Sequence, residues 1–396
     1  MRLLNAIKQI KPKDFLAPLV FLVLFVPSIV FRTVNRAKHR KLWLVTEGGE
    51  ARDNGYHFFK YIREKYPDDF CFYVVKTDSV GYEKVLELGN IIKYASLKHW
   101  LYYMSANLNI SSQKSGNPCP IFWYFMHVIL GLYKNRVFLQ HGITKDDADW
   151  LYYKKTKFKY FICGAKREYD YIRKKFGYLA DALLLTGFPR WDTLRDTSLN
   201  RREKSILIMP TWRNWLGGEK NTLFEIKNFQ NTNYYKYWNG LLNDEDFIEF
   251  VERNKIIIYF YPHINMQIFL DDFKLSSENI KIISYNEDIQ EYLGKCKLMI
   301  TDYSSVAFDF AYLNKPVIYY QFDLEDYRKK QYREGYFDYE KDGFGPVSFN
   351  RKEVLNEIKY YIKTDFNSKK KYSNNMKKFF LFRDRKNSER VYRAIK

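Results

Sequence analysis

The stretch that decides the fold, residues 301–328, reads TDYSSVAFDFAYLNKPVIYYQFDLEDYR. The run Lys297–Ile300 before it, apolar after its lysine, predicts a buried strand, and the run Val306–Leu313 within it predicts an apolar helix. A helix that begins at Ser304 or Ser305 presents unpaired backbone N–H groups, two hydroxyls and the positive end of its dipole to an anion. The stretch therefore predicts a phosphate-binding turn between a strand and a helix.

A simpler interpretation of this turn needs no ligand. Asp302 and Ser304 can cap the helix by accepting hydrogen bonds from its first backbone N–H groups. One turn alone does not separate the two interpretations. The phosphate-binding interpretation is favoured because comparable polar turns follow other strands of the chain.

Strand-like and helix-like stretches alternate along the chain, which is typical of an α/β fold with parallel sheets. A helix is predicted at Gly55–Lys65. The strands predicted in the first half are Trp43–Thr46, Phe70–Val75, Leu108–Ser111, Arg136–Leu139, Tyr160–Cys163 and Ala182–Leu185. Those predicted in the second half are Ser205–Met209, Lys255–Phe260, Ile280–Ile283, Lys297–Ile300 and Pro316–Tyr320. A polar stretch at residues 196–204 separates the two series, so we expect domains at residues 41–200 and 201–396.

Composition agrees with two domains and indicates anionic partners. The chain has 396 residues, of which 46% are hydrophobic, enough for two sizeable cores. Its net charge of +20 favours polyanions, which include nucleic acid, anionic lipid and phosphorylated substrates. The cysteines show neither CxxC nor Cys/His metal spacing, so we expect free thiols in a reducing compartment at Cys71, Cys119, Cys163 and Cys296.

An apolar segment near the N-terminus, Phe15–Phe31, has 17 residues and no charged side chain. As a continuous helix it would be about 26 Å long, near the lower limit for crossing a bilayer, and Pro18 and Pro27 are expected to interrupt it. The basic residues that flank it are Arg2, Lys8, Lys11, Lys13, Arg32, Arg36, Lys38, Arg40 and Lys41. A signal peptide would end in a small-residue cleavage site rather than a basic cluster. We therefore expect residues 1–40 to hold the chain on an anionic membrane surface, by dipping into one leaflet or by a marginal span, rather than to form a buried core helix.

Two polar turns follow strands of the first half, where open α/β sheets bind ligands. His141 lies in the turn Leu139–Gly142, whose Gly142 lets a substrate approach the backbone, and it is a candidate base. The alternative for His141 is a surface or capping histidine. In the turn Thr186–Asp192, Arg190 and Asp192 either point into a polar crevice or pair with each other.

Polar residues also follow the strands of the second half. Thr211 and Arg213 follow Ser205–Met209, and the planar guanidinium of Arg213 suits phosphate oxygens. His263 ends the next long strand and can donate a hydrogen bond to a diphosphate, the alternative being a core or surface histidine. We expect Arg213 and His263 to lie close to the turn that contains Ser304 and Ser305. All of them follow strands of the same half, and parallel strands end at the same edge of a sheet.

In their order along the chain and in their residues, these motifs resemble those of the CDP-glycerol glycerophosphotransferase family, the teichoic acid primases and polymerases of bacterial walls and capsules. The resemblance covers roughly residues 135–350. Its motifs are LQHG at 139–142, TGFPRWDTL at 186–194, ILIMPTWR at 206–213, the 301–328 stretch, Gly335–Glu340 and Gly345-Pro346. Two departures are Ile264, where the family often has proline, and Lys145-Asp146-Asp147, where a more basic loop is expected. They bear on donor geometry and on the identity of the acceptor.

The resemblance implies a glycosyltransferase-B-like fold, in which two Rossmann-like domains face a cleft, with the nucleotide on the C-terminal half and the acceptor on the N-terminal half. It implies transfer of glycerol phosphate or ribitol phosphate from CDP-glycerol or CDP-ribitol, with release of CMP. The acceptor would be a hydroxyl of a polyprenyl-diphosphate-linked saccharide or of a growing poly(alditol phosphate). The enzyme would act at the cytoplasmic face of the cell membrane.

Within this reaction we assign His141 as the general base, since the acceptor hydroxyl must lose its proton. The donors expected to face the diphosphate are His263, Arg213, Ser304 and Ser305. The residues expected to complete the donor pocket are Gly142, Thr211, Thr301 and Asp302.

No pair of acidic residues stands at a convincing strand end, so we expect chemistry that requires no metal or other cofactor, although Mg²⁺ can accompany the donor. A rival prediction is a nucleotide-sugar-dependent glycosyltransferase of the same architecture, for which the serine turn would serve equally well. A non-enzymatic polyanion or nucleic-acid binder is disfavoured, because the cationic residues are dispersed and no recognised nucleic-acid motif is present.

Overall fold

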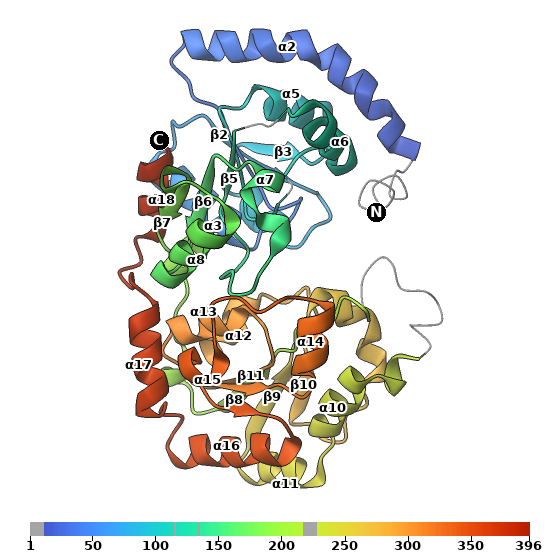
Figure 1. The fold of residues 1–396 in the computed structure, drawn as a ribbon, viewed down its shortest axis with the longest axis vertical. Helices are drawn as coiled ribbons and strands as arrows, with labels where there is room; N and C mark the ends of the chain where they lie inside the picture. Colours follow the sequence, from blue (N-terminus) through green and yellow to red (C-terminus); the bar gives the residue numbers. More distant parts are fainter. Residues whose placement is uncertain (1–11, 115, 133–134, 217–227) are drawn as a thin grey trace. The chain divides into compact units, whose positions relative to one another are not determined.

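Two β-sheets, both built of parallel strands, organise the residues that the computed structural model describes, namely 12–114, 116–132, 135–216 and 228–396 (Figure 1). The first sheet has seven strands in the order β3-β2-β1-β4-β5-β6-β7, and the second has six in the order β10-β9-β8-β11-β12-β13. The predicted α/β class with parallel sheets is confirmed.

The strands of the first sheet are β1 Trp43–Thr46, β2 Cys71–Val75, β3 Ile91–Lys93, β4 Leu108–Ser111, β5 Arg136–Phe138, β6 Tyr160–Cys163 and β7 Leu183–Leu185. Those of the second sheet are β8 Lys204–Ile208, β9 Ile256–Phe260, β10 Ile280–Ile282, β11 Leu298–Thr301, β12 Val317–Tyr320 and β13 Val347–Ser348. Every strand predicted from the sequence is present, with each end within one residue of the predicted one. The short edge strands β3 and β13 were not predicted.

The helices before residue 194, with the last helix of the chain, are η1 Pro12–Leu16, α2 Ala17–Ala37, α3 Asn54–Lys65, α4 Tyr82–Leu86, α5 Leu97–Ser105, α6 Pro120–Leu130, η2 Asp149–Leu151, α7 Tyr153–Thr156, α8 Lys166–Phe176, η3 Ala180–Ala182, η4 Pro189–Asp192 and α18 Asn387–Ile395. The others are η5 Ser198–Asn200, η6 Phe229–Asn231, α10 Asn233–Leu242, α11 Glu245–Arg253, η7 Ile264–Asp272, α12 Ile289–Lys295, α13 Val306–Tyr312, α14 Leu324–Lys330, α15 Tyr339–Asp342, α16 Arg351–Lys363 and α17 Lys370–Phe379.

The chain divides into two units, and it passes between them more than once. Unit 1 comprises residues 1–141, 149–193 and 382–396, and unit 2 comprises residues 142–148 and 194–381. The change from unit 1 to unit 2 between residues 193 and 194 lies close to the boundary expected near residues 196–204, whereas residues 142–148 and 382–396 depart from the expected domains at 41–200 and 201–396. The C-terminal α18 belongs to unit 1 because Asp192 accepts hydrogen bonds from the backbone N–H groups of Asn387 (2.8 Å) and Ser388 (2.7 Å).

Alternate residues of the strands in unit 2 form one side of a core. Helices α10, α11 and α16 cover this side, with Trp238, Val251 and Ile358 fully buried. The strand residues that contribute to it are Ile206, Ile208, Ile258, Phe260, Leu298, Ile300, Ile318 and Tyr320. This spacing of two is what an extended strand requires of a buried face.

In unit 1, helix α2 lies along α5 and α6 (Figure 1). Phe21 packs edge-on against Trp123 at 6.0 Å between ring centroids, and Phe31 packs against Tyr102 at 5.1 Å. The helix is continuous through Pro27, so the expected interruption there is wrong. By length and composition the helical segment Asp14–Ala37 could cross a membrane, and 11% of its apolar window is buried. The flanking Arg2, Lys8 and Lys11 lie outside the described residues.

The order of the strands places a topological switch point in each sheet. In unit 1 the strands after β1 are added toward one edge of the sheet as far as β3, and those from β4 onward are added toward the other edge. In unit 2 the same change of direction falls between β8 and β11. In open α/β sheets ligands bind beyond the carboxyl ends of the strands at such a point. The residues that follow these strands are therefore the ones to examine for function.

Candidate functional site

His141 lies at the end of β5 in unit 1, where a strained turn presents it. The residue before it, Gln140, has a φ of 61°, in the left-handed region that non-glycine residues rarely adopt. Its side-chain amide donates to the carbonyl of Ile162 (2.6 Å) and to Glu168 Oε1 (2.9 Å), which holds this conformation. Asn54 Nδ2 donates to the Gln140 carbonyl at 2.8 Å. The turn is thus fixed before any ligand binds.

Asp53 orients the imidazole of His141. The Asp53 Oδ2 to His141 Nδ1 distance is 2.7 Å, and the His141 side chain is 66% exposed. Asp53 itself caps α3 by accepting from the Asn54 backbone N–H at 2.7 Å. A carboxylate on Nδ1 favours the tautomer that carries its proton there, so Nε2 has a lone pair available to accept a proton.

Arg190 completes this cluster from η4. Its Nη1 donates to Asp53 Oδ1 (2.6 Å) and to the His141 carbonyl (2.8 Å), so one guanidinium holds both members of the pair. For this turn the sequence predicted either a polar crevice or an Arg190–Asp192 pair, and the structure shows another partner for each residue. Arg190 pairs with Asp53, and Asp192 binds α18.

Glu47 lies beneath the pair and is 5% exposed. Its carboxylate accepts from the backbone N–H groups of Arg52 (2.8 Å), Asp53 (3.0 Å) and Tyr56 (2.6 Å), which orders the loop between β1 and α3. Burial first, and then the charge of Asp53, raise the pKa of Glu47 to about 7. One negative charge is therefore held preferentially on Asp53, where it faces His141.

The charges set the proton affinity of the pair. Burial alone would raise the pKa of Asp53, but the charges of Arg190 and His141 outweigh it and lower the pKa to about 2. Desolvation lowers the pKa of His141, but the charge and hydrogen bond of Asp53 outweigh this and raise it above the ordinary 6.5. Asp53 is thus ionised at neutral pH, and His141 is a stronger base than a free histidine.

In unit 2, Asp302 organises the turn after β11. Its Oδ1 accepts from the backbone N–H groups of Thr211 (2.8 Å) and Tyr303 (2.6 Å), which joins the turns after β8 and β11. The Thr301 hydroxyl donates to the Met209 carbonyl at 2.7 Å, which also links the end of β11 to the turn after β8. These two residues therefore shape the turn, and their place in the donor pocket stays a prediction.

Arg213 occupies a different position from the one predicted for a diphosphate ligand. Its side chain is 0% exposed, and its Nε and Nη2 donate to the two oxygens of Asp323 at 2.8 and 2.9 Å. Nη2 also lies 2.8 Å from Asp302 Oδ2. Burial lowers the pKa of Arg213, but the two carboxylates outweigh it and raise the pKa. The guanidinium is committed to these carboxylates, so the prediction of direct phosphate contact is wrong for this geometry and Arg213 positions the turn instead.

The serines lie at the start of α13, which runs from Val306 to Tyr312. Ser305 is the residue before the helix, and Ser304 Oγ accepts from the Val306 backbone N–H at 3.2 Å. The capping interpretation is therefore correct for Ser304. Both serines are partly exposed, and the phosphate contact predicted for them stays a prediction.

His263 precedes η7 in unit 2. Its Nδ1 accepts from the Asn265 backbone N–H at 3.2 Å, and its ring stacks on Trp212 at 6.0 Å. A neutral imidazole that accepts at Nδ1 carries its proton on Nε2, which is the donor that the prediction requires. Gly142 opens residues 142–148 of unit 2. The structure thus brings Thr211, Arg213, Thr301 and Asp302 together, and it leaves His141 with unit 1.

The partners of these residues were not predicted from the sequence. Asp53 and Glu47 follow β1 in a loop that contains two glycines of positive φ, Gly48 and Gly49, which is a recognisable signal of a functional turn. Asp323 follows β12 in the same way, and its position after a strand could have marked it.

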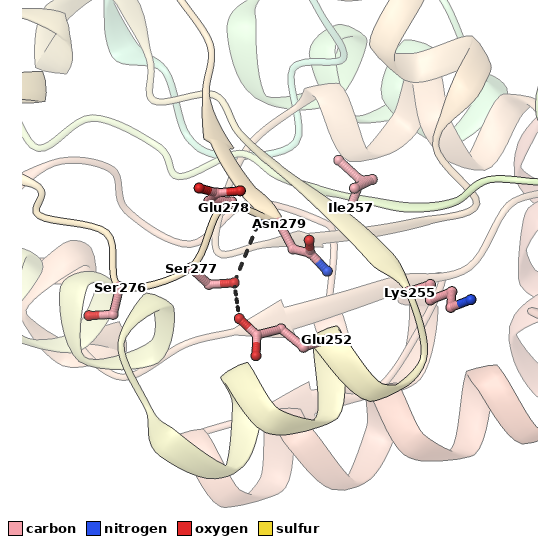
Figure 2. Close-up of a pocket in the computed structure, with 7 residues that line it drawn as sticks. All are labelled: Glu252, Lys255, Ile257, Ser276, Ser277, Glu278 and Asn279. Atoms are coloured by element: carbon pink, nitrogen blue, oxygen red, sulfur yellow. Dashed lines mark hydrogen bonds between the residues drawn. The ribbon is translucent and has the colours of Figure 1, made fainter.

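Across the described ranges, no group of three or more His, Cys, Asp or Glu side chains is arranged to hold a metal ion. That the chemistry requires no metal stays a prediction. A cavity of about 490 Å³ lies in another part of unit 2 (Figure 2). It is lined by Glu252, Lys255, Ile257, Ser276, Ser277, Glu278 and Asn279. These residues flank the amino ends of β9 and β10, opposite the edge where parallel sheets bind ligands, so this cavity is not the candidate site.

Comparison with known proteins gives a consistent result. A family model described as CDP-Glycerol:Poly(glycerophosphate) glycerophosphotransferase matches residues 28–396. The minor teichoic acid biosynthesis protein GgaB of Bacillus subtilis (strain 168) is 34% identical over 374 residues, which are 92% of this chain and 40% of that protein. The teichoic acid glycerol-phosphate primase of the same organism is 29% identical over 238 residues, 57% of this chain and 55% of that protein. The chain thus spans only part of the length of these relatives.

A solved structure of the wall teichoic acid polymerase TagF is also similar. Its TM-score is 0.66, with 17% sequence identity over 93% of this chain and 96% of that chain. At this identity the likeness shows the fold.

Proposed function

The chain belongs to the CDP-glycerol:poly(glycerophosphate) glycerophosphotransferase family, and from this premise we propose that it transfers an alditol phosphate from CDP-glycerol or CDP-ribitol to a hydroxyl acceptor. The acceptor hydroxyl belongs to a polyprenyl-diphosphate-linked saccharide or to a growing poly(alditol phosphate). CMP is the leaving group. That the two units are Rossmann-like domains facing a cleft, in the manner of glycosyltransferase-B enzymes, is part of this proposal.

The observation that carries the proposal is the pair of Asp53 and His141, with an exposed imidazole whose Nδ1 is already engaged. His141 Nε2 takes the proton of the acceptor hydroxyl as its oxygen bonds to the alditol-bearing phosphorus. The bond from this phosphorus to the bridging oxygen breaks, and both its electrons leave with CMP. Asp53 stabilises the positive charge that His141 gains.

The donor lies, in this proposal, over the turn of unit 2 that Asp302 organises. Ser304, Ser305 and His263 supply hydrogen-bond donors to the charge that builds up on the departing CMP. Arg213 acts from beneath by holding Asp302 and Asp323. Preorganised donors of this kind favour the transition state because they need no rearrangement as charge develops.

The N-terminal helix places the enzyme on its lipid-borne substrate. One side of α2 packs on α5 and α6, and Ser105 Oγ donates to the Ser28 carbonyl at 3.1 Å. Leu22 and Val26 on the helix are 69% and 63% exposed. A helix that packs lengthwise on its own unit suits a position in one leaflet better than a span, so we propose attachment at the cytoplasmic face.

The test is CMP release by the purified protein from CDP-glycerol and, separately, from CDP-ribitol, with a lipid-linked saccharide acceptor, with and without EDTA. Release from one donor that is abolished in His141→Ala supports the proposal and identifies the alditol. The control is His39→Ala, an exposed histidine at the end of α2 that is expected to leave release unchanged. Absence of release from both donors, with transfer from a nucleotide sugar, would establish the rival glycosyltransferase function.

A further inference from the structure

Residues 142–148 belong to unit 2, although the chain on both sides of them belongs to unit 1. Asp146 Oδ1 accepts from Arg328 Nη1 at 2.6 Å, and Asp146 also pairs with Lys145. The backbone of Asp147 forms an antiparallel bridge with Arg333, with a distance of 3.1 Å from its N to the Arg333 carbonyl. Side-chain and main-chain bonds thus hold this segment, which we call the 142–148 strap, against residues 328–336.

Close backbone packing reinforces the strap. A Cβ at Gly335 would lie 2.1 Å from the Lys145 carbonyl oxygen and 2.8 Å from Asp146 Cα, so only glycine fits there. The Tyr336 backbone N–H donates to the same Lys145 carbonyl at 3.2 Å. Asp146 and Lys145 are 8% and 4% exposed. The charge of Asp146, part of the departure from the family pattern, is therefore neutralised within unit 2 by Lys145 and Arg328.

Packed aromatic rings connect the strap to the turn after β11 that Asp302 organises, which we call the donor turn. Tyr327, next to Arg328, stacks on Tyr303 of the turn, with 3.9 Å between centroids and 18° between planes. Tyr339 meets Tyr303 edge-on at 6.2 Å, and Lys145 Nζ lies 5.6 Å from the centre of the Tyr339 ring. Unit 2 thus contains one continuous contact path from the turn at Tyr303 to the strap.

The base is one peptide bond from this strap, because Gly142 follows His141. Consecutive Cα atoms are about 3.8 Å apart, so anchoring the strap restricts where His141 can lie relative to the donor turn. We propose that the strap holds His141 in register with the donor phosphate, and that Asp146 and Arg328 are positioning residues for the transfer reaction. This inference rests on the proposed function of His141 as the base. Phosphoryl transfer depends on such alignment, and a displacement of about 1 Å can lower a rate about 10²-fold.

The experiment compares Asp146→Asn, Arg328→Gln, their double variant and Arg328→Lys in the full chain. The control is Asp326→Asn, which removes a carboxylate from an exposed ion pair with Lys330 on the same helix. We expect each single variant to lower kcat about tenfold or more, with an unchanged Kd for CDP-glycerol in calorimetry. The double variant should lose little more than the worse single variant, and Arg328→Lys should recover part of the loss.

The outcomes separate positioning from a merely structural role. Loss of donor affinity together with kcat, or a kcat equal to that of the control, would overturn the inference. An inactive His141→Ala beside a fully active Arg328→Gln would overturn only this inference and leave the proposed function standing. A fully active His141→Ala would remove the base and the inference with it.

Discussion

Replacing Asp53 by asparagine tests the Asp53–His141 pair most directly. Asparagine can still cap α3, but it removes the negative charge that lies 2.7 Å from His141 Nδ1. The pKa of His141 should then fall, since the charge of Asp53 is what raises it above 6.5 against desolvation. In the proposed function the neutral imidazole is the base, so the acid limb of the rate profile should lie above pH 6.5 in the wild type and move to lower pH in Asp53→Asn.

The same variant should also lose turnover and a pH-dependent part of the stability. Loss of the carboxylate that stabilises the imidazolium should lower kcat about 10²-fold. The pKa of Asp53 falls from 3.8 to about 2 on folding, and each unit corresponds to about 1.4 kcal/mol, so the ionised group contributes about 2 kcal/mol. This stability is present above pH 3.8 and is lost as the pH falls through about 2.

Two measurements check these expectations. Initial rates of CMP release between about pH 5 and about pH 9 give the acid limb, and unfolding in acid gives the stability term. Asp181→Asn, an exposed carboxylate of the same unit, serves as the control and should change neither. An acid limb that stays in place in Asp53→Asn, or wild-type turnover, would refute the reasoning.

Three further predictions concern other residues. His141→Ala should lower turnover about 10²-fold or more while the Kd for CDP-glycerol in calorimetry stays the same; near-normal turnover would remove it from the mechanism. Arg213→Ala should lower the free energy of unfolding in urea by about 3–5 kcal/mol, because it leaves buried carboxylates unpaired, and a loss within error of zero would contradict its buried position. Leu22→Glu with Val26→Glu should weaken binding to anionic vesicles in a flotation assay, whereas Leu179→Glu, 71% exposed elsewhere in unit 1, should not; vesicle binding equal to wild type would argue against α2 as the anchor.

The sequence alone was sufficient for every strand of the two sheets except β3 and β13, because strands and turns leave local signals. Runs such as Lys255–Phe260 are apolar after the first residue for the length of a strand, and polar turns such as Leu139–Gly142 follow strands of this kind. The edge strands β3 and β13 escaped prediction because two or three residues are too few to show a pattern. The position of His141 at a strand end was likewise readable from its neighbours.

What surrounds these residues depends on contacts between distant parts of the chain. Asp53 is 88 residues from His141, and Asp323 is 110 residues from Arg213, and no periodicity links such pairs. A guanidinium fork has the same sequence signature whether it faces a phosphate or a buried carboxylate. Only the tertiary structure shows that Arg213 is enclosed, that Asp53 orients His141, and that residues 142–148 fold with unit 2. Sequence patterns record which residues are apolar and where a strand ends, whereas a charge's partner is decided by how the elements pack.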